Sequence, residues 1–283
     1  MKNIKEPLMK FVFLLSACVS IVAVIMICIF LFVNGIPAIS KIGVPEFLLG
    51  EKWKPMQNIY GIFPMILGSI YVTAGAVIAG VPTGILCAVF MSEFCPAKLY
   101  RILKPAINLM AGIPSIVYGL FGLTVIVPIV RNLSGSNGKG IFTASVLLGI
   151  MILPTIISVS ESAIRAVPRG YYEGALALGA AHERSVFFAM LPAARSGITA
   201  GVVLGIGRAI GETMAVIMVA GNQPVIPNGI FRGVRTLTSN IVIEMGYAAD
   251  MHRDALIATG VVLFVFILII NFMFSLIRKR SEN

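Results

Sequence analysis

Six stretches of this chain are long enough to cross a membrane and almost free of charge. They span residues 11–33, 61–91, 106–130, 141–164, 197–220 and 255–277. A helix needs about 20 apolar residues to cross the hydrocarbon core of a bilayer. Lipid also forces every backbone hydrogen bond to be made internally, and the alternating pattern of a membrane barrel is absent. The chain is therefore predicted to be an all-α, polytopic membrane protein with six transmembrane helices.

The composition agrees with this fold class. Only 12% of the residues are charged and 58% are hydrophobic, whereas about 25% of the residues in a typical soluble domain are charged. The second stretch is longer than one span requires and is interrupted by several glycines and prolines. We expect it to form a tilted or broken helix with an extra turn outside the bilayer.

The distribution of Lys and Arg predicts the orientation. If the N-terminus is inside, the inner segments hold 13 of the 22 Lys and Arg residues and the outer segments hold 8. This bias places both termini in the cytoplasm. The basic residues are scattered over all the loops, so the net charge of +10 does not indicate a nucleic-acid partner. The first stretch is longer than the apolar core of a signal peptide, and we expect a retained anchor.

No motif for covalent chemistry is found. The segment SGSNGKGIF superficially resembles a phosphate-binding loop, but Leu133 and Gly140 occupy two of the positions that define that motif, so we expect a short outer turn. His182 and His252 stand alone and are expected to be surface residues of loops. The four cysteines, none in an outer loop, suggest neither a disulfide framework nor a metal site.

Two charges interrupt the fifth apolar stretch. Arg208 and Glu212 are the only charged residues in 197–220, and a charge at the bilayer centre costs at least about 3 kcal/mol. On a continuous helix, Glu212 would lie one turn beyond Arg208 on the same face. Two roles are open for this pair. The two charges could simply neutralise each other, or they could line a path for an anion. In the second role the guanidinium binds the oxyanion, and Glu212 holds Arg208 when the path is empty.

The inner loop at 165–196 has a helical pattern of its own. Pro168 and Gly170 precede a stretch from 171 to 178 that can form two helical turns, and Gly179 ends it; a second helical stretch runs to Pro192. Glu173 is expected in the first turn, where it would complement the helix dipole. This short helix has small residues beside larger apolar ones, a pattern that fits binding in a groove on a partner protein.

The same loop resembles that of the binding-protein-dependent type I ABC permeases, whose pattern is E-A-A-x-x-x-G, nine residues, then I-x-L-P. Glu173, Ala175, Gly179, Leu191 and Pro192 match this pattern, whereas Gly174 and Ala189 depart from it. In that family the loop forms the coupling helix that docks into an ATPase. The resemblance implies an ATPase-coupling role for Tyr171, Tyr172, Glu173, Gly174, Ala175, Leu176 and Gly179.

Four further phrases resemble the phosphate uptake permeases. They are FLLGEKWKP (47–55), MAGIPSIVYGLFGL (110–123), GRAIGETMAVIMVAGN (207–222) and VRTLTSNIVIEMGYAADMHRDAL (234–256), and the last two are more similar to the PstC type of subunit than to the PstA type. The resemblance implies a type I ABC permease (MetI-like) fold and an anion pathway. The candidate substrate-path residues are Arg208, Glu212, Ser115 and Tyr118, although Ser115 and Tyr118 fit helix packing better.

This resemblance also implies a domain organisation and a set of partners. Residues 1–60 would hold the N-terminal anchor and first outer loop, 61–277 the permease domain with its coupling loop, and 278–283 a basic cytoplasmic tail. The expected partners are a second permease subunit (PstA-like), two ATPase subunits (PstB-like) that use ATP, an external phosphate-binding protein (PstS-like), phosphate and the lipid bilayer. This chain would bind no cofactor itself. A permease for another oxyanion, a stand-alone anion channel or carrier, and an intramembrane enzyme are the alternatives.

Overall fold

The computed structural model describes residues 5–282. Residues 1–4 and 283 lie outside the described residues, as do the side chains of residues 5–7, 274–275 and 277–283. The predicted basic tail at 278–283 is therefore described only by its backbone through Glu282, and its side chains lie outside the described residues.

The described chain consists almost entirely of helices. The α-helices are α1 (Lys5–Ile42), α2 (Val44–Leu49), α3 (Phe63–Val89), α4 (Ala97–Gly112), α5 (Ser115–Phe121), α6 (Val127–Ser134), α7 (Ile141–Arg165), α8 (Arg169–Ala177), α9 (His182–Ser185), α10 (Leu191–Gly211), α11 (Met214–Val219), α12 (Leu237–Glu244) and α13 (Asp250–Glu282). Three π-helical turns, η2 (Phe90–Phe94), η3 (Gly122–Ile126) and η4 (Val186–Met190), continue neighbouring helices, and the 3-10 turn η1 (Pro55–Gln57) connects the two strands β1 (Trp53–Lys54) and β2 (Ile59–Tyr60) of an antiparallel hairpin.

Six helical segments of the described chain are long and apolar enough to cross a membrane. They are Leu8–Ile42, Phe63–Phe94, Ser115–Ser134, Ile141–Arg165, His182–Gly211 and Asp250–Met273. The prediction of an all-α protein with six candidate spans is thus confirmed. The second span is one long helix, α3, extended by η2, so the expected break within it is absent from this part of the described chain.

The limits of all six spans differ from the predicted ones, and in the third and fifth the start of the span moves by nine residues or more. The third was placed at 106–130, but the chain bends at Ile113 and Pro114, which have extended backbone conformations, and the span begins at Ser115. The residue before a proline is disfavoured in the α conformation, which explains the bend. The fifth was placed at 197–220, yet its helix begins at His182 and ends at Gly211.

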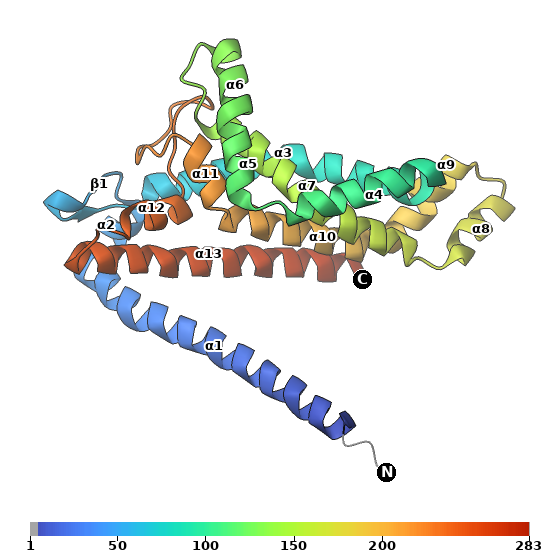
Figure 1. Ribbon diagram of the computed structural model, residues 1–283, viewed down its shortest axis with the longest axis horizontal. Coiled ribbons are helices and arrows are strands. Elements are labelled where there is room, and N and C mark those ends of the chain that lie inside the picture. The colour runs from blue at the N-terminus through green and yellow to red at the C-terminus, as the bar shows by residue number, and fades with distance from the viewer. Residues whose placement is uncertain (1–4, 283) are drawn as a thin grey trace.

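The long helices lie roughly alongside one another in Figure 1, with α8 and α9 at one end of the molecule and the β-hairpin, α2 and the start of α13 at the other. α5 and α6 are steeply inclined to the other helices. α1 packs on α13 only near its C-terminal end, where the rings of Phe32 and Phe264 are 5.9 Å apart. The start of α1 and the end of α13 lie toward the α8 end.

The centre of the bundle is the contact of α3 with α7, on which α10 also packs. Ala76, Gly80 and Gly84 are spaced by four residues on α3 and are buried. A Cβ atom at Gly80 would lie 2.8 Å from the Cδ1 atom of Ile152 on α7. Small residues at this spacing let two helix backbones approach closely, which fixes the position of α7 and of the residues that it carries.

A second core joins residues from both sides of the predicted boundary at residue 60. Phe47, Trp53 and Tyr60 pack in one buried cluster with Ile62 and Leu256. The segment 44–60 therefore packs on the first turns of α3 and α13. The division of the chain into 1–60 and 61–277 stays a prediction.

The packing predicts unequal effects of two Gly→Ala changes in helices. A Cβ at Gly68 on α3 would clash with the backbone carbonyl of Arg235, whereas a Cβ at Gly207 on α10 would meet no atom within 4 Å. Gly68→Ala should destabilise the protein by about 1–3 kcal/mol through overpacking, while Gly207→Ala should be neutral or stabilising, since Ala is the better helix former. Thermal unfolding of the two purified variants in detergent measures this, and equal unfolding temperatures would contradict the packing argument.

Candidate functional site

The two charges of the fifth predicted span lie on either side of a helix end. Arg208 belongs to the last turn of α10, which ends at Gly211, and Glu212 has an extended backbone, with φ −69° and ψ 132°. A new helix, α11, begins at Met214. The prediction that Glu212 lies one turn beyond Arg208 on the same helical face is therefore wrong, because the helix does not continue through Glu212.

Glu212 is held by backbone contacts on the far side of this break. Its Oε1 atom accepts a hydrogen bond of 3.2 Å from the backbone N–H of Ala215, in the first turn of α11. A carboxylate in this position satisfies a free N–H group and complements the helix dipole. The backbone carbonyl of Glu212 also accepts a hydrogen bond of 3.1 Å from the Thr238 hydroxyl of α12. These contacts explain why the chain leaves the helix here.

Arg208 has a neutral partner instead of an acidic one. Its Nη1 atom donates a hydrogen bond of 3.3 Å to the Thr155 hydroxyl of α7. Among the ion pairs of the described residues, none involves Arg208 or Glu212. The arrangement in which the two charges neutralise each other is thus not the one in the structure. Most guanidinium donors of this half-buried side chain remain available to an anion.

One of the two other predicted path residues lies near the end of α10. Tyr118 of α5 is buried in the same apolar cluster as Ala209, the residue after Arg208. Its hydroxyl donates a hydrogen bond of 2.9 Å to the backbone carbonyl of Met110, across the bend between α4 and α5. Ser115 is the half-buried first residue of α5, and its side chain makes no hydrogen bond among those of the described residues. Thr155 was missed, because an uncharged Thr in an apolar helix carries no distinctive sequence signal.

The predicted coupling residues form an exposed helix at one end of the bundle. α8 ends in a Schellman motif: the N–H of Ala180 donates to the carbonyl of Ala175 at 3.1 Å, and that of Gly179 donates to Leu176 at 2.9 Å. Gly179 has a φ of +85°, which glycine adopts without strain. The prediction that Gly179 ends this helix is confirmed.

α8 contains no buried residue, and most of its side chains are exposed. Tyr171, Glu173, Gly174, Leu176 and Gly179 are exposed, and Tyr172 and Ala175 are half-buried. Because α8 begins at Arg169, Glu173 lies beyond its first turn, which holds no acidic residue. The expected contact of Glu173 with the helix dipole is therefore wrong.

The start of α8 is bound to η2, at the C-terminal end of α3. Arg169 forms an ion pair of 3.3 Å with Glu93 of η2, whose side chain is 3% exposed. Nδ1 of His182 lies 2.9 Å from the Tyr172 hydroxyl, and its ring lies against Phe94 with centroids 4.8 Å apart. His182 begins α9 and is half-buried, so the expectation of a loop surface residue is wrong.

Glu161 joins three elements at the same end of the molecule. Its buried carboxylate accepts hydrogen bonds from the Tyr100 hydroxyl at 2.7 Å, from Lys104 Nζ at 2.7 Å and from Arg165 Nε at 3.0 Å. Arg165 also donates to the carbonyl of Met91 at 3.0 Å. The hydrogen bond to Glu161, together with burial, raises the pKa of Tyr100. Glu161 and Arg165 are one helical turn apart on α7 and form an ion pair, to which α4 adds two further partners.

A second buried network lies at the opposite end. Glu244 of α12 accepts from Arg235 Nη1 at 2.5 Å and from Trp53 Nε1 at 2.8 Å, and His252 Nε2 lies 2.8 Å from it. His252 is half-buried and its ring lies against Tyr60. The expectation of a solvent-exposed loop histidine is wrong here too. The network links the β-hairpin, α12 and α13, and it directs the side chain of Arg235 toward Glu244.

The described residues contain no group of three His, Cys, Asp or Glu side chains that could hold a metal ion. The four cysteines are free thiols. What the structure does place together is a cation with free donors at the end of an apolar helix, and an exposed helix at one end of the molecule. A cation in that position suits the recognition of an anion.

Comparison with known proteins shows which family the sequence resembles. The family described as "Binding-protein-dependent transport system inner membrane component" matches residues 80–283. The chain is 38% identical to the probable ABC transporter permease protein YqgH of Bacillus subtilis over 275 residues, which cover 93% of this chain and 89% of YqgH. It is 35% identical to the phosphate transport system permease protein PstC of Haemophilus influenzae, over 92% of this chain and 89% of that protein.

Two solved structures share the fold. An inward-facing structure of the MetNI methionine ABC transporter superposes with a TM-score of 0.64 and 20% identity, over 81% of this chain and 99% of the matched chain. A bacterial alginate ABC transporter with its substrate-bound periplasmic protein gives a TM-score of 0.65 and 16% identity, over 99% and 96%. The expected type I ABC permease (MetI-like) fold is confirmed.

The Glu161 network predicts a stability difference between two glutamates. Glu161→Gln should lower the free energy of unfolding by about 1–3 kcal/mol, because two cations would lose a charged partner and buried hydrogen bonds would weaken. Glu183→Gln is the matched control, since Glu183 is exposed and outside the ion pairs of the described residues. Thermal unfolding followed by circular dichroism checks this. The same unfolding temperature for both variants would show that the Glu161 network contributes little.

Proposed function

The chain belongs to the family of binding-protein-dependent transport system inner membrane components, and we propose that it is the permease subunit of an ATP-driven importer that moves inorganic phosphate across the cytoplasmic membrane. Its relatives of known name act as transport subunits, and this chain is likewise a transport subunit and not an enzyme. The choice of an anionic substrate rests on Arg208. Its guanidinium lies at the end of an apolar helix and has no acidic partner among the described residues.

The geometry around Arg208 supports an oxyanion path. A guanidinium presents parallel N–H donors that match two oxygens of a phosphate. Thr155 occupies one of these donors at 3.3 Å and orients the side chain without neutralising its charge. Since Glu212 is bound at the start of α11, it does not hold Arg208 when the path is empty, contrary to the expectation from the sequence.

The helix break offers a way to move this charge. Arg208 ends α10, and the extended residue Glu212 connects it to α11. Such a break can change its backbone angles while both helices keep their hydrogen bonds. The Thr238 hydroxyl links the break to α12 at the outer end. A shift of α10 relative to α7 would therefore change the position of Arg208 in the path.

The partners follow from the family. We propose that a second permease subunit (PstA-like), two ATPase subunits (PstB-like) and an external phosphate-binding protein (PstS-like) complete the transporter, and that ATP is used only by the ATPase subunits. α8 is proposed to dock on the ATPase through Tyr171, Glu173 and Leu176. This chain itself binds no cofactor in the proposal.

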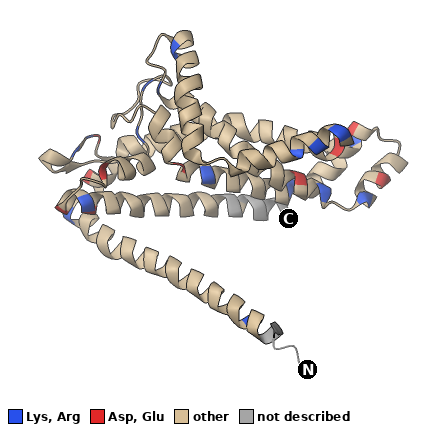
Figure 2. Ribbon diagram, in the orientation of Figure 1, with Lys and Arg blue, Asp and Glu red and all other residues tan. Residues whose placement is uncertain are grey.

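The charge distribution supports the orientation. Figure 2 shows Lys and Arg gathered at the end of the bundle that holds α8, α9 and the start of α4. With that end in the cytoplasm, the chain obeys the positive-inside tendency, and both termini are cytoplasmic. The host is proposed to be a bacterium or an archaeon.

A permease for another oxyanion and a stand-alone anion channel or carrier remain the competing functions. The channel leaves α8 without a role, although α8 is exposed, capped and joined to α3 by the Arg169–Glu93 ion pair. Phosphate uptake by this chain in liposomes without any ATPase would favour the channel.

Substitutions of Arg208 test the proposed path. Arg208→Lys should reduce ATP-driven phosphate uptake by about tenfold or more, because lysine keeps the charge but loses the fork of donors. The measurement is uptake of labelled phosphate by proteoliposomes that contain the assembled transporter. Arg195→Lys is the matched control, since Arg195 belongs to the other end of α10 and its side chain is exposed.

The double exchange Arg208→Glu with Glu212→Arg tests whether Arg208 itself is needed in the path or whether transport requires only that the two charges sum to zero. Because the two side chains form no ion pair, the exchanged variant should not recover transport. Full uptake by the exchanged variant, with normal assembly, would disprove the path assignment.

A charge reversal on α8 tests coupling. Glu173→Lys should weaken co-purification of the ATPase while membrane insertion is unaffected, because it reverses an exposed charge at the proposed interface. Glu183→Lys supplies the same change on an exposed residue of neighbouring α9. If Glu173→Lys leaves both ATPase binding and transport at the level of that control, α8 does not form the interface.

A further inference from the structure

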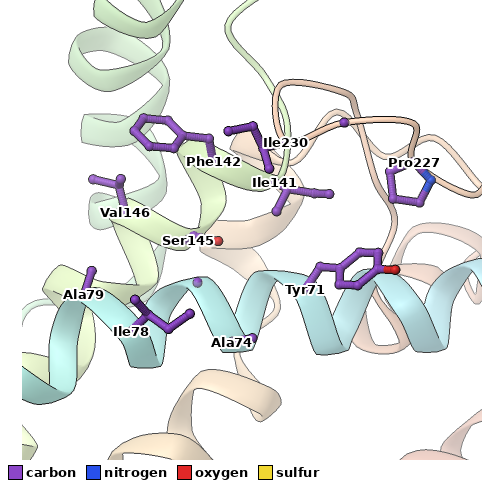
Figure 3. A pocket seen from close by; sticks show the side chains of 12 residues that line it. Tyr71, Ala74, Ile78, Ala79, Ile141, Phe142, Ser145, Val146, Pro227 and Ile230 are labelled. Atoms are coloured by element: carbon purple, nitrogen blue, oxygen red, sulfur yellow. The ribbon is translucent and has the colours of Figure 1, made fainter.

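Two cavities meet at the outer loop between α11 and α12, and they differ in chemistry. The first has a volume of about 590 Å³ and lies between α3, α7 and the loop; Figure 3 shows that apolar side chains such as Ile78, Phe142 and Ile230 form its walls. The second, of about 420 Å³, lies between the turn after α6 and the segment Phe231–Gly233, and its walls are mainly polar. The rings of Phe142 and Phe231, 5.5 Å apart, separate the two cavities.

In the turn that forms one wall of the polar cavity, the serine side chains hydrogen-bond to groups of α6 and of the turn itself. The Ser134 hydroxyl donates to the carbonyl of Val130 at 2.7 Å and lies 2.7 Å from that of Ser136. Ser136 Oγ also accepts the N–H of Gly138 at 3.1 Å. The acceptors of this wall are therefore largely engaged, and the turn has a defined shape without a ligand.

Most of the groups that remain free in this cavity are hydrogen-bond donors, the side-chain carbonyl of Gln223 being a free acceptor. The side-chain carbonyl of Asn137 accepts from the N–H of Lys139 at 3.0 Å, which leaves its NH₂ group free. Arg232 and Gln223 also line the cavity. No hydrogen bond or ion pair of the described residues involves the side chain of either residue. No carboxylate lines the cavity.

Arg232 is held in place by its backbone while its side chain stays exposed. Its carbonyl accepts from the N–H of Ile141 at 3.2 Å, and its N–H donates to Gly229 at 3.2 Å. Arg131 lies in the last turn of α6, and Lys139 is in the connection to α7. Figure 2 shows basic segments and no acidic segment at the top of α6 and on the loop beside it. The local field is therefore positive.

From these contacts we propose that the polar cavity is an oxyanion-binding site that receives inorganic phosphate at the outer mouth before it reaches Arg208. The inference rests on the proposed function for its substrate and its orientation. Arg232 supplies the charge, and the amides of Asn137 and Gln223 supply neutral donors. A free tetrahedral phosphate and the phosphodiester of a lipid headgroup share this chemistry, and the experiment distinguishes them.

The test measures equilibrium binding of radiolabelled inorganic phosphate to the assembled transporter without binding protein or ATP. Every sample carries Arg208→Gln, so that phosphate binding at Arg208 does not contribute to the signal. On this background, adding Arg232→Gln should weaken binding about tenfold or more, because a charge-assisted contact is lost. Adding Arg253→Gln, which removes an exposed outer cation on α13 away from the cavity, should change nothing. Arg232→Lys should retain part of the binding.

Two lipid environments identify the source of the anion. If the cavity takes free phosphate, the effect of Arg232→Gln appears both in phospholipid nanodiscs and in a detergent without phosphate groups. An effect in detergent alone would mean that lipid headgroups fill the cavity in a bilayer, and would overturn the receiving role. An effect in neither environment would overturn the site.

Further outcomes separate this site from the proposed function. If Arg232→Gln weakens only the attachment of the external binding protein and leaves phosphate binding unchanged, the cavity is a protein contact and the inference is wrong. The wild-type complex is assayed in parallel for ATP-driven phosphate uptake. If the wild-type complex takes up phosphate but Arg232→Gln does not weaken phosphate binding, only the proposed site is wrong. If the wild-type complex takes up no phosphate, the proposed function is wrong.

Discussion

The close contact of α3 with α7 determines where the rest of the structure can lie. Ala76, Gly80 and Gly84 give α3 a face without bulky side chains, so the ridge of Ile152 and Ile156 on α7 can enter it. Helices in lipid gain no hydrophobic stabilisation from association, and packing of this kind is what holds them together. The contact places Thr155 beside Arg208 and brings Glu161 to α4.

Both ends of this bundle carry buried charged networks, and each joins elements that are distant in sequence. Glu161 links α7 to α4, and Glu244 links α12 to the hairpin at Trp53. Replacing Arg235 or Lys104 would leave the buried carboxylate of Glu244 or Glu161 with less counter-charge, and an uncompensated buried charge costs more than the pair itself contributes. Arg208 differs from both, because its only hydrogen-bond partner among the described residues is the neutral Thr155. A rigid frame around one unneutralised cation suits a protein that binds an anion only in passage.

The errors in the expectations from sequence have a common physical origin. Helical periodicity implied that Glu212 faces Arg208, yet a backbone N–H of α11 and a hydroxyl of α12 compete for Glu212 and end the helix. His182 and His252 carried no apolar pattern around them, and aromatic rings from other elements cover them. In each case the competing partner is remote or follows a break, so local spacing holds no information about it.

The sequence by itself determined the number of spans, the all-α class, the end of α8 at Gly179 and the resemblance that points to the transporter family, because each depends on local apolar length, glycine geometry or a motif at fixed spacing. It also located Arg208 as the unusual charge. Only the tertiary structure decided which groups surround that charge. Thr155 contacts it from α7, Glu212 turns to α11, and the donors of the polar cavity come from two separate loops. These contacts depend on how closely the helices pack, which the one-dimensional pattern does not specify.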